Sequence, residues 1–262
     1  MIGETLAERL SCIGELSSAD RAALADVKGT VRPVAKGCDI LTAGEEPEFA
    51  VLVLRGLLCH HRWKRDGTRQ IHSFYLAKDA PSLESLHIDY VDSNLGAVVQ
   101  STVALIPHAE LFRVMEQRPN LRALMWRETL VQAAIVREWL TRNSTLPAHS
   151  ALAHLFCEMF VRAQAAELTT GGSCDLPATQ ETLAHALGLT AVHVNRTLQM
   201  LRETEMVDLK NGRLYVHEFD QLAALGEFDP SYLHLQRCSK AVRHAAATSP
   251  RQTIAGGAGL IQ

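Results

Sequence analysis

Between residues 177 and 207, the sequence PATQETLAHALGLTAVHVNRTLQMLRETEMV places polar side chains at helical spacing on both sides of a short break. Thr179 and Thr190 each suit the N-cap of a helix, and Gly188 suits the end of the first helix because glycine tolerates positive φ. Two helices joined by such a tight turn are typical of a helix-turn-helix, whose second helix enters the major groove of DNA. The spacing therefore predicts sequence-specific DNA binding, with a recognition helix at about 190–203.

The chemistry expected of this segment is hydrogen bonding to base edges and to phosphates. Arg196 is the one long cation on the free face of the second helix, and arginine can donate two hydrogen bonds to guanine. His193 and Asn195 are candidates for base or phosphate contacts. The N-termini of both helices are expected to contact phosphates. Two cations flank the tip of a predicted hairpin at 207–219, the wing, and could contact the DNA backbone. The predicted DNA-binding residues are Thr179, Gln180, Thr190, Val192, His193, Asn195, Arg196, Gln199, Lys210 and Arg213.

The pattern of apolar residues in the N-terminal half changes from helical to strand-like along the chain. An amphipathic helix is predicted from apolar residues at three- and four-residue spacing, namely Leu6, Leu10, Ile13 and Leu16. From about 31 to 107, short β-branched runs alternate with turn-forming stretches, which predicts a β-barrel or β-roll. Asp66-Gly67 predicts a two-residue hairpin turn within it.

A long helix is predicted at about 119–142, opened by Pro119. One apolar stripe on it comprises Leu121, Leu124, Val131 and Ile135, and a neighbouring stripe comprises Met125, Val136 and Trp139. A helix with so wide an apolar surface needs two partners. We expect its own β domain on one face and the same helix of a second copy on the other, the alternative being burial within one chain.

The remaining segments complete a second domain. The stretch 143–147 predicts a helix break and a domain boundary, and 149–167 predicts another amphipathic helix. Residues 169–175 are expected to form a loop. The run 207–219 predicts a hairpin with Asn211-Gly212 at its tip in a type I′ turn. The basic, Gly- and Ala-rich tail of 236–262 is expected to be disordered.

Composition limits the class of protein. Hydrophobic residues make up 47% and charged residues 21%, as in folded soluble proteins, and no apolar run is long enough to span a membrane, so a cytoplasmic location is expected. Residues 145–235 hold five Lys and Arg against eleven Asp and Glu, which is unusual beside nucleic acid. The sequence has neither a Gly-rich phosphate loop nor a paired-carboxylate motif, and therefore does not predict an enzyme.

In the order of its predicted elements and in their sequence motifs, the chain resembles the Crp/Fnr superfamily of bacterial transcription regulators from roughly residue 10 to residue 235. The resemblance rests on ILTAGEEPEFAVLVLRGLL at 40–58, the hairpin centred on Asp-Gly, LPATQETLAHALGLTAVHVNRTLQMLRE at 176–203 and the wing. It implies an α+β fold in four parts: a jelly-roll-like β-roll similar to cyclic-nucleotide-binding domains at 1–118, a dimerisation helix at 119–143, a winged helix-turn-helix at 144–235, and the tail. It also implies a homodimer on a palindromic operator, and RNA polymerase as a partner if the protein is an activator.

Departures from the family pattern bear on the signal that is sensed. No arginine lies between Arg69 and Arg113 and the glycine-rich turn is missing, which counts against cyclic-nucleotide binding although Glu84 is present. Val192 replaces the glutamate usual in the recognition helix, so the operator read should differ.

Two alternative readings remain. Cysteines, or the Cys59-His60-His61 run, could make the protein a redox, metal or haem sensor, but two same-face ligands are too few for a closed metal site, so neither a cofactor nor a metal is predicted. The alternative suggested by the acidic C-terminal part is a ligand-binding module that contacts protein instead of DNA.

Overall fold

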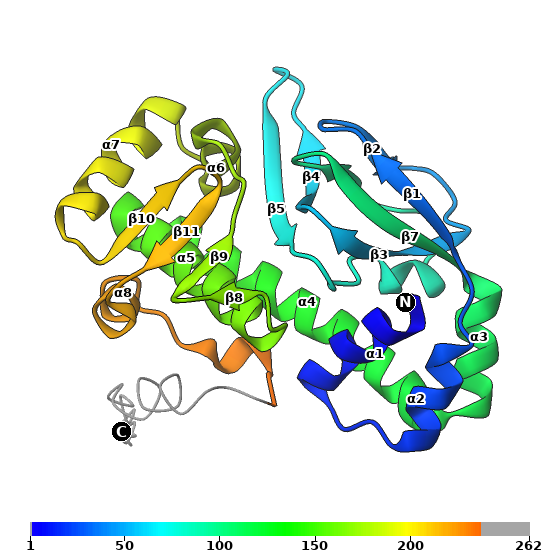
Figure 1. Ribbon diagram of the computed structural model, residues 1–262. Helices are drawn as coiled ribbons and strands as arrows, with labels where there is room; N and C mark the ends of the chain where they lie inside the picture. Colours follow the sequence, from blue (N-terminus) through cyan, green and yellow to red (C-terminus); the bar gives the residue numbers. More distant parts are fainter. Residues whose placement is uncertain (1, 237–262) are drawn as a thin grey trace, which may run out of the picture.

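The alternating apolar runs of the N-terminal half form a β-roll in the computed structural model, which describes residues 2–236 (Figure 1). Its strands are β1 (Thr30–Val34), β2 (Asp39–Leu41), β3 (Phe49–Arg55), β4 (Leu58–Trp63), β5 (Arg69–Tyr75), β6 (Asn94–Ala97) and β7 (Ser101–Pro107). They form two antiparallel sheets, in the orders β1-β7-β3 and β2-β6-β4-β5. Apolar residues from both sheets, including Val51, Leu95 and Val103, pack into one buried cluster inside the roll.

The β4–β5 hairpin ends in a wider loop than the sequence indicated. The predicted two-residue turn at Asp66-Gly67 was wrong, because residues 64–68 all lie between the two strands. Gly67 takes a φ of 79°, and the backbone N–H of Lys64 donates to the carbonyl of Thr68 at 2.8 Å. The Asp66 carboxylate accepts hydrogen bonds from the backbone N–H and the hydroxyl of Thr68, which stabilises the wider turn.

Helices cover one side of the roll and connect it to the rest of the chain. They are α1 (Ile2–Ile13), α2 (Ser18–Ala25), the 3₁₀ turn η1 (Leu83–Leu86), α3 (His108–Gln117) and α4 (Pro119–Thr145). Figure 1 shows α4 running from the roll to the second lobe. Leu16, predicted within the first helix, lies in the link between α1 and α2.

The helix α4 continues beyond the break predicted at 143. The hydroxyl groups of Ser144 and Thr145 donate to backbone carbonyls one turn earlier, so these polar residues do not disrupt the last turn. The side-chain amide of Asn143 donates to the carbonyl of Ala186 at 2.9 Å. The end of α4 is therefore fixed to the second lobe.

The second lobe is a small α+β unit. Its elements are α5 (Ala148–Ala165), β8 (Thr169–Thr170), β9 (Ser173–Asp175), α6 (Gln180–Leu187), α7 (Ala191–Glu203), β10 (Val207–Lys210), β11 (Arg213–Val216), α8 (Phe219–Leu225) and the 3₁₀ turn η2 (Pro230–Leu233). The loop predicted at 169–175 was wrong. Gly171 and Gly172 take positive φ and turn the chain back, so that β8 and β9 join the wing sheet in the order β10-β11-β9-β8. The tail from residue 237, with Cys238, lies outside the described residues.

Burial along α4 differs from the stripes expected. Leu121, Leu124, Val131 and Ile135 are buried as predicted, but Met125 and Trp139 of the second stripe are buried in the same chain too. Trp139 packs edge-on against Phe74 of β5 and donates its indole N–H to Glu158 at 2.9 Å. Of that stripe only Val136 is exposed, so Met125 and Trp139 are not available to a second copy.

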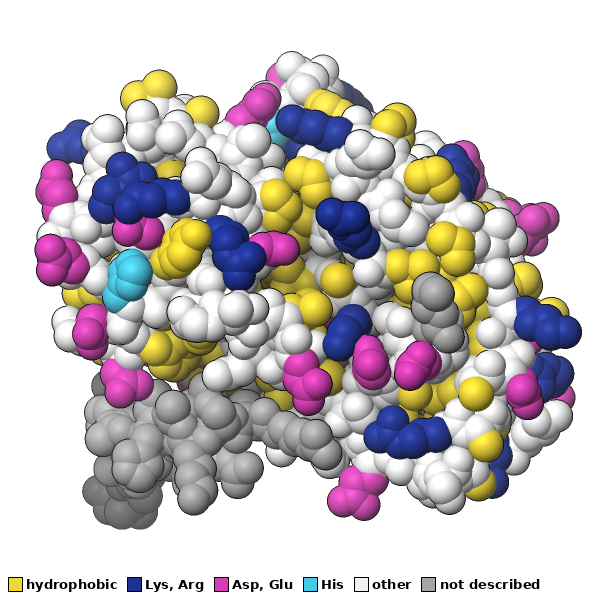
Figure 2. Space-filling model, viewed as in Figure 1, with side chains coloured by type: hydrophobic (Ala, Val, Ile, Leu, Met, Phe, Trp, Pro, Cys, Tyr) yellow, Lys and Arg dark blue, Asp and Glu magenta, His cyan; other side chains and the backbone are white. Residues whose placement is uncertain are grey.

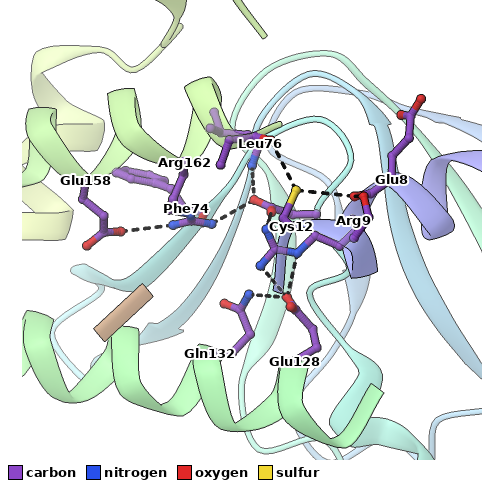
Figure 3. Close-up of polar contacts among 12 residues, drawn as sticks. Glu8, Arg9, Cys12, Phe74, Leu76, Glu128, Gln132, Glu158 and Arg162 are labelled. Atoms are coloured by element: carbon purple, nitrogen blue, oxygen red, sulfur yellow. Dashed lines mark hydrogen bonds and ion pairs between the residues drawn. The ribbon is translucent and has the colours of Figure 1, made fainter. Parts of the chain in front are cut away.

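A buried ionic network fastens the two lobes together (Figure 3). Arg9 of α1 pairs with Glu128 of α4 at 2.7 Å and with Asp79, in the segment after β5, at 3.0 Å. Arg162 of α5 pairs with the same Asp79 at 2.8 Å and with Glu158 at 3.0 Å. Burial alone lowers the pKa of Arg9, but its two carboxylate partners outweigh that effect and raise it. These ion pairs therefore join the helix-turn-helix lobe to the roll.

Candidate nucleic-acid interface

The helices α6 and α7 form the predicted helix-turn-helix. The Thr179 hydroxyl caps α6 by accepting from the N–H of Thr182 at 3.1 Å, and the Thr190 hydroxyl caps α7 by accepting from the N–H of His193 at 3.2 Å. Gly188 ends α6 with a φ of 67°, as the sequence indicated. Val194 and Leu201 are buried against the lobe. These contacts fix which face of α7 is left to solvent.

That free face carries the predicted base-contacting side chains. Val192, His193, Asn195, Arg196 and Gln199 are all exposed, and Val192 is 81% exposed. Within residues 2–236, Arg196 makes no ion pair, so its guanidinium is free to donate. The face combines hydrogen-bonding groups with one apolar tip, which suits the edges of bases in a major groove.

A hydrogen bond links the two helices across this surface. The side-chain amide of Gln180 donates to Oδ1 of Asn195 at 3.2 Å. It occupies an acceptor position on Asn195 and leaves the Nδ2 hydrogens free to donate. Gln180 and Asn195, predicted separately as a phosphate contact and a base contact, thus lie together.

The wing cations are engaged with acids of their own lobe. Lys210 pairs with Asp208 at 2.8 Å, and Arg213 pairs with Asp175 at 2.8 Å. A hydrogen bond from Lys210 contributes most to lowering the pKa of Asp208. Between the two cations, Asn211 and Gly212 both take positive φ, which confirms the predicted type I′ tip. Lys210 and Arg213 do lie beside the tip, but each carries a carboxylate partner.

A cleft with no signature in the sequence separates the helix-turn-helix from the roll. It encloses about 710 Å³, and the starts of α6 and α7 form one wall through Thr179, Gln180 and Ala191. The opposite wall comes from the β1–β2 connection and the β4–β5 hairpin through Lys36, Gly37, Trp63, Gly67, Thr68 and Arg69. Because the two walls are far apart in sequence, only the fold brings them together.

A second cavity, of about 420 Å³, lies between the roll and α4. Its lining includes Glu84, His60 and His72. Burial raises the pKa of Glu84 to about 7 and lowers the pKa of His60 to about 4. Arg62 also lines this cavity, donating from Nε to the carbonyl of Asp92 at 2.8 Å. Arg62 lies on β4, outside the interval between Arg69 and Arg113 in which the sequence contains no arginine.

The Cys59-His60-His61 run does not form a metal centre in the described part of the chain. Cys59 is fully buried, and His61 instead contacts Asp39, with 2.9 Å between Nε2 and Oδ1. No group of three His, Cys, Asp or Glu residues able to hold a metal ion occurs among residues 2–236. Burial raises the pKa of the Cys59 and Cys174 thiols to about 12, which lowers their reactivity near neutral pH.

Comparison with known proteins agrees with this geometry. Residues 150–225 match the Crp-like helix-turn-helix domain. The chain is 25% identical to a probable transcriptional activator of Rhizobium leguminosarum bv. viciae, over 73% of this chain and 79% of that protein. It is also 25% identical to the fumarate and nitrate reduction regulatory protein of Escherichia coli K12, over 74% of this chain and 77% of that protein.

Among solved structures, FixK2 from Bradyrhizobium japonicum shares the fold, with a TM-score of 0.66 and 20% identity over 76% of this chain and 98% of that one. No helix among the described residues combines the length and apolar character needed to cross a membrane. The sequence relatives and the matched domain point to the same kind of protein, and the solved structure shows the same fold. The chain carries a Crp-like helix-turn-helix domain and is a DNA-binding transcription regulator similar to those of the Crp/Fnr type.

Proposed function

We propose that the protein acts in the cytoplasm as a homodimer on a two-fold symmetric DNA site, with one α7 helix in each of two major grooves. The observation that carries this proposal is the exposed face of α7, on which Arg196 is unpaired within the described chain. In a helix-turn-helix dimer the two recognition helices enter grooves about one helical turn apart. Arg196 donates to a guanine edge, and the N-terminus of α6 contacts phosphates through Thr179 and Gln180.

The dimer forms through α4. An exposed apolar stripe follows this helix, comprising Trp126, Leu130, Val136 and Leu140, which are 43–72% exposed. Side chains this apolar and this exposed on one long helix are typical of a surface that a partner covers. A second α4 across a two-fold axis presents the same stripe and buries it.

Each part of the chain then has its role. Residues 1–118 receive the signal, 119–143 supply the dimer helix and 144–235 read DNA. Where the outcome is activation, RNA polymerase is the further partner.

Selection of bound duplexes from a random pool tests the proposal. We expect a palindromic sequence with half-sites about one helical turn apart. Arg196→Ala should weaken binding to that sequence by about 1–3 kcal/mol and relax the preference at one base pair of each half-site. Arg21→Ala, an exposed arginine on α2, is the control and should leave both unchanged.

A salt titration separates DNA recognition from a protein-contacting role. Phosphate contacts make the observed affinity fall steeply as salt rises, because bound counterions are released. If the pool yields no enriched sequence and binding has no salt dependence, the helix-turn-helix does not read DNA.

A further inference from the structure

The helix-turn-helix lobe offers little positive charge of its own to DNA. Of its five Lys and Arg residues, Arg162 is buried between Asp79 and Glu158, and three others are paired with acids of the same lobe: Arg202, Lys210 and Arg213. Among the described residues this leaves Arg196. Eleven acids in the same lobe oppose the approach of a polyanion. The charge that draws DNA to this surface must therefore come from elsewhere in the molecule.

Among residues 2–236, a basic segment that lies beside this surface belongs to the roll. The β4–β5 hairpin projects beside α6 at the upper edge of the molecule, and β5 packs against α6 (Figure 1). Lys36 and Arg69 line the same cleft as Thr179, Gln180 and Ala191, at the starts of the two helices. Figure 2 shows Lys and Arg side chains on both lobes along the upper part of this face.

The hairpin tip is exposed and its cations are free. Lys64 and Arg65 lie in the loop of residues 64–68, and neither makes an ion pair within the part of the chain that the structure describes. The one acid of the loop, Asp66, accepts two hydrogen bonds from Thr68 inside the turn. Trp63, the residue before this loop, is 60% exposed, and the guanidinium carbon of Arg69 lies 5.9 Å from the centre of its ring.

We propose that the β4–β5 hairpin is a second DNA-contacting surface, on which Lys64 and Arg65, with Lys36 and Arg69 behind them, bind the phosphate backbone next to the base pairs that α7 reads. This inference rests on the proposed function, because it takes α6 and α7 as the helices that bind the DNA site.

Continuity of the backbone favours duplex DNA over a small anion. Duplex DNA carries one negative charge about every 1.7 Å along its axis, so a strand held at the start of α6 continues with further phosphates. The hairpin forms part of the facing wall of the cleft, and its two loop cations, Lys64 and Arg65, are exposed and lie outside the cleft lining. The roll thereby supplies the charge that the acidic lobe lacks.

Salt-dependent binding of the full-length protein to its selected duplex tests this surface. The variant is Lys64→Gln/Arg65→Gln. The matched control is Arg21→Gln/Lys28→Gln, which removes one arginine and one lysine that are also exposed, from α2 and the segment after it. The salt slope should decrease by about one for each phosphate that the variant no longer neutralises, hence by up to about four for a dimer with two hairpins. Affinity at low salt should fall about tenfold or more for selected and random duplexes alike.

Neutral methylphosphonate linkages provide the second measurement. Replacing single phosphates outside the base pairs that α7 reads should weaken wild-type binding and leave the hairpin variant unaffected. If the hairpin variant keeps the wild-type affinity and slope, the hairpin does not contact DNA, even though the protein does. If phosphates matter at no flanking position, the inference fails in the same way. Failure of the proposed function differs, because then the wild type itself selects no sequence and Arg196→Ala changes nothing.

Discussion

At the scale of single residues, the exposed face of α7, which we propose reads DNA, offers two kinds of contact. Arg196 is exposed and unpaired within residues 2–236, and it can form directional hydrogen bonds. Val192 is 81% exposed in the first turn of the same helix and can make only apolar contacts, such as with the methyl group of thymine. An operator read by this pair should therefore place a hydrogen-bonding purine near a thymine.

The exposure of these residues could be predicted from the sequence because the bounds of their helix are set locally. A capping threonine and a C-terminal glycine fix the start and end of a helix through local hydrogen bonds and backbone conformation, so the exposed face follows from counting. The ion pairs of Lys210 and Arg213 and the cleft walls of Lys36 and Arg69 join distant segments, and no local pattern predicts them.

Glu84 gives a pH-dependent stability that can be measured. Burial raises its pKa from 4.5 to about 7, so its stabilising contribution is fully present below pH 4.5 and is lost as the pH rises to 7. Glu84→Gln should therefore unfold with a free energy about 1–3 kcal/mol higher than that of the wild type at pH 8, and the gain should disappear near pH 4.5.

Urea titration at a series of pH values measures this difference. Comparing variant with wild type cancels the opposite effect of His60, whose pKa burial lowers to about 4 and whose contribution is lost as the pH falls from 6.5. A gain that stays constant across the whole pH range would mean that the Glu84 carboxyl is not the titrating group.

At the scale of elements, α4 shows where periodicity is and is not informative. The 3.6-residue repeat identified a long helix and the stripe that packs on its own chain. It could not show which of the remaining faces is buried within the chain, because Met125 and Trp139 on one side are as apolar as Trp126 and Leu140 on the other. Which side is left open depends on where the roll and α5 pack, and Trp139 is held inward by Glu158.

The exposed stripe of α4 predicts the effect of one substitution. Leu140 is 72% exposed, so Leu140→Glu should fold normally as a monomer. In a dimer it places like charges opposite one another, and we expect the molar mass from sedimentation or light scattering to fall toward that of one chain. Affinity for the palindrome should fall with it.

The control for this variant is Val31→Glu, which introduces the same charge at an exposed apolar residue of β1. It should leave both the mass and the affinity unchanged. A Leu140→Glu protein that remains dimeric would place the dimer interface elsewhere.

At the scale of the whole molecule, the two lobes share one interior. A single hydrophobic cluster runs from Leu6 in α1 and Leu52 in β3, through Ile135 in α4, to Leu183 in α6 and Leu214 in β11. The hydrophobic pattern of the sequence indicated a β-rich region followed by a mainly helical one, and this division is visible in Figure 1. Their shared core was not predictable, because contacts between distant segments leave no periodic signal.

The Arg162 ion pairs test how tightly the lobes are joined. Arg162→Met removes the guanidinium that pairs with Asp79 and Glu158 and leaves both carboxylates buried without it. We expect the free energy of unfolding to fall by about 3–5 kcal/mol, as for other broken buried ion pairs. Urea denaturation followed by circular dichroism and by tryptophan fluorescence gives the measurement.

The control is Arg113→Met, which removes a partly exposed arginine of α3 paired with Glu110 and should change little. In the wild type the two probes should report the same transition, because Trp139 reports on the shared core. Stability equal to that of the wild type in Arg162→Met would show that the network does not fasten the lobes.

The continuous core also limits how such a regulator can evolve. Exchange of reading heads between related proteins is simple where each head keeps its own interior and only a linker is cut. Here a transplanted DNA-binding lobe would lack the residues of the roll and α4 against which its core packs. It would also lack Asn143 at the end of α4, whose side-chain amide donates to the carbonyl of Ala186. New operator preferences in this lineage should therefore arise by point changes on the outer side of α7, which leave the seam between the lobes untouched.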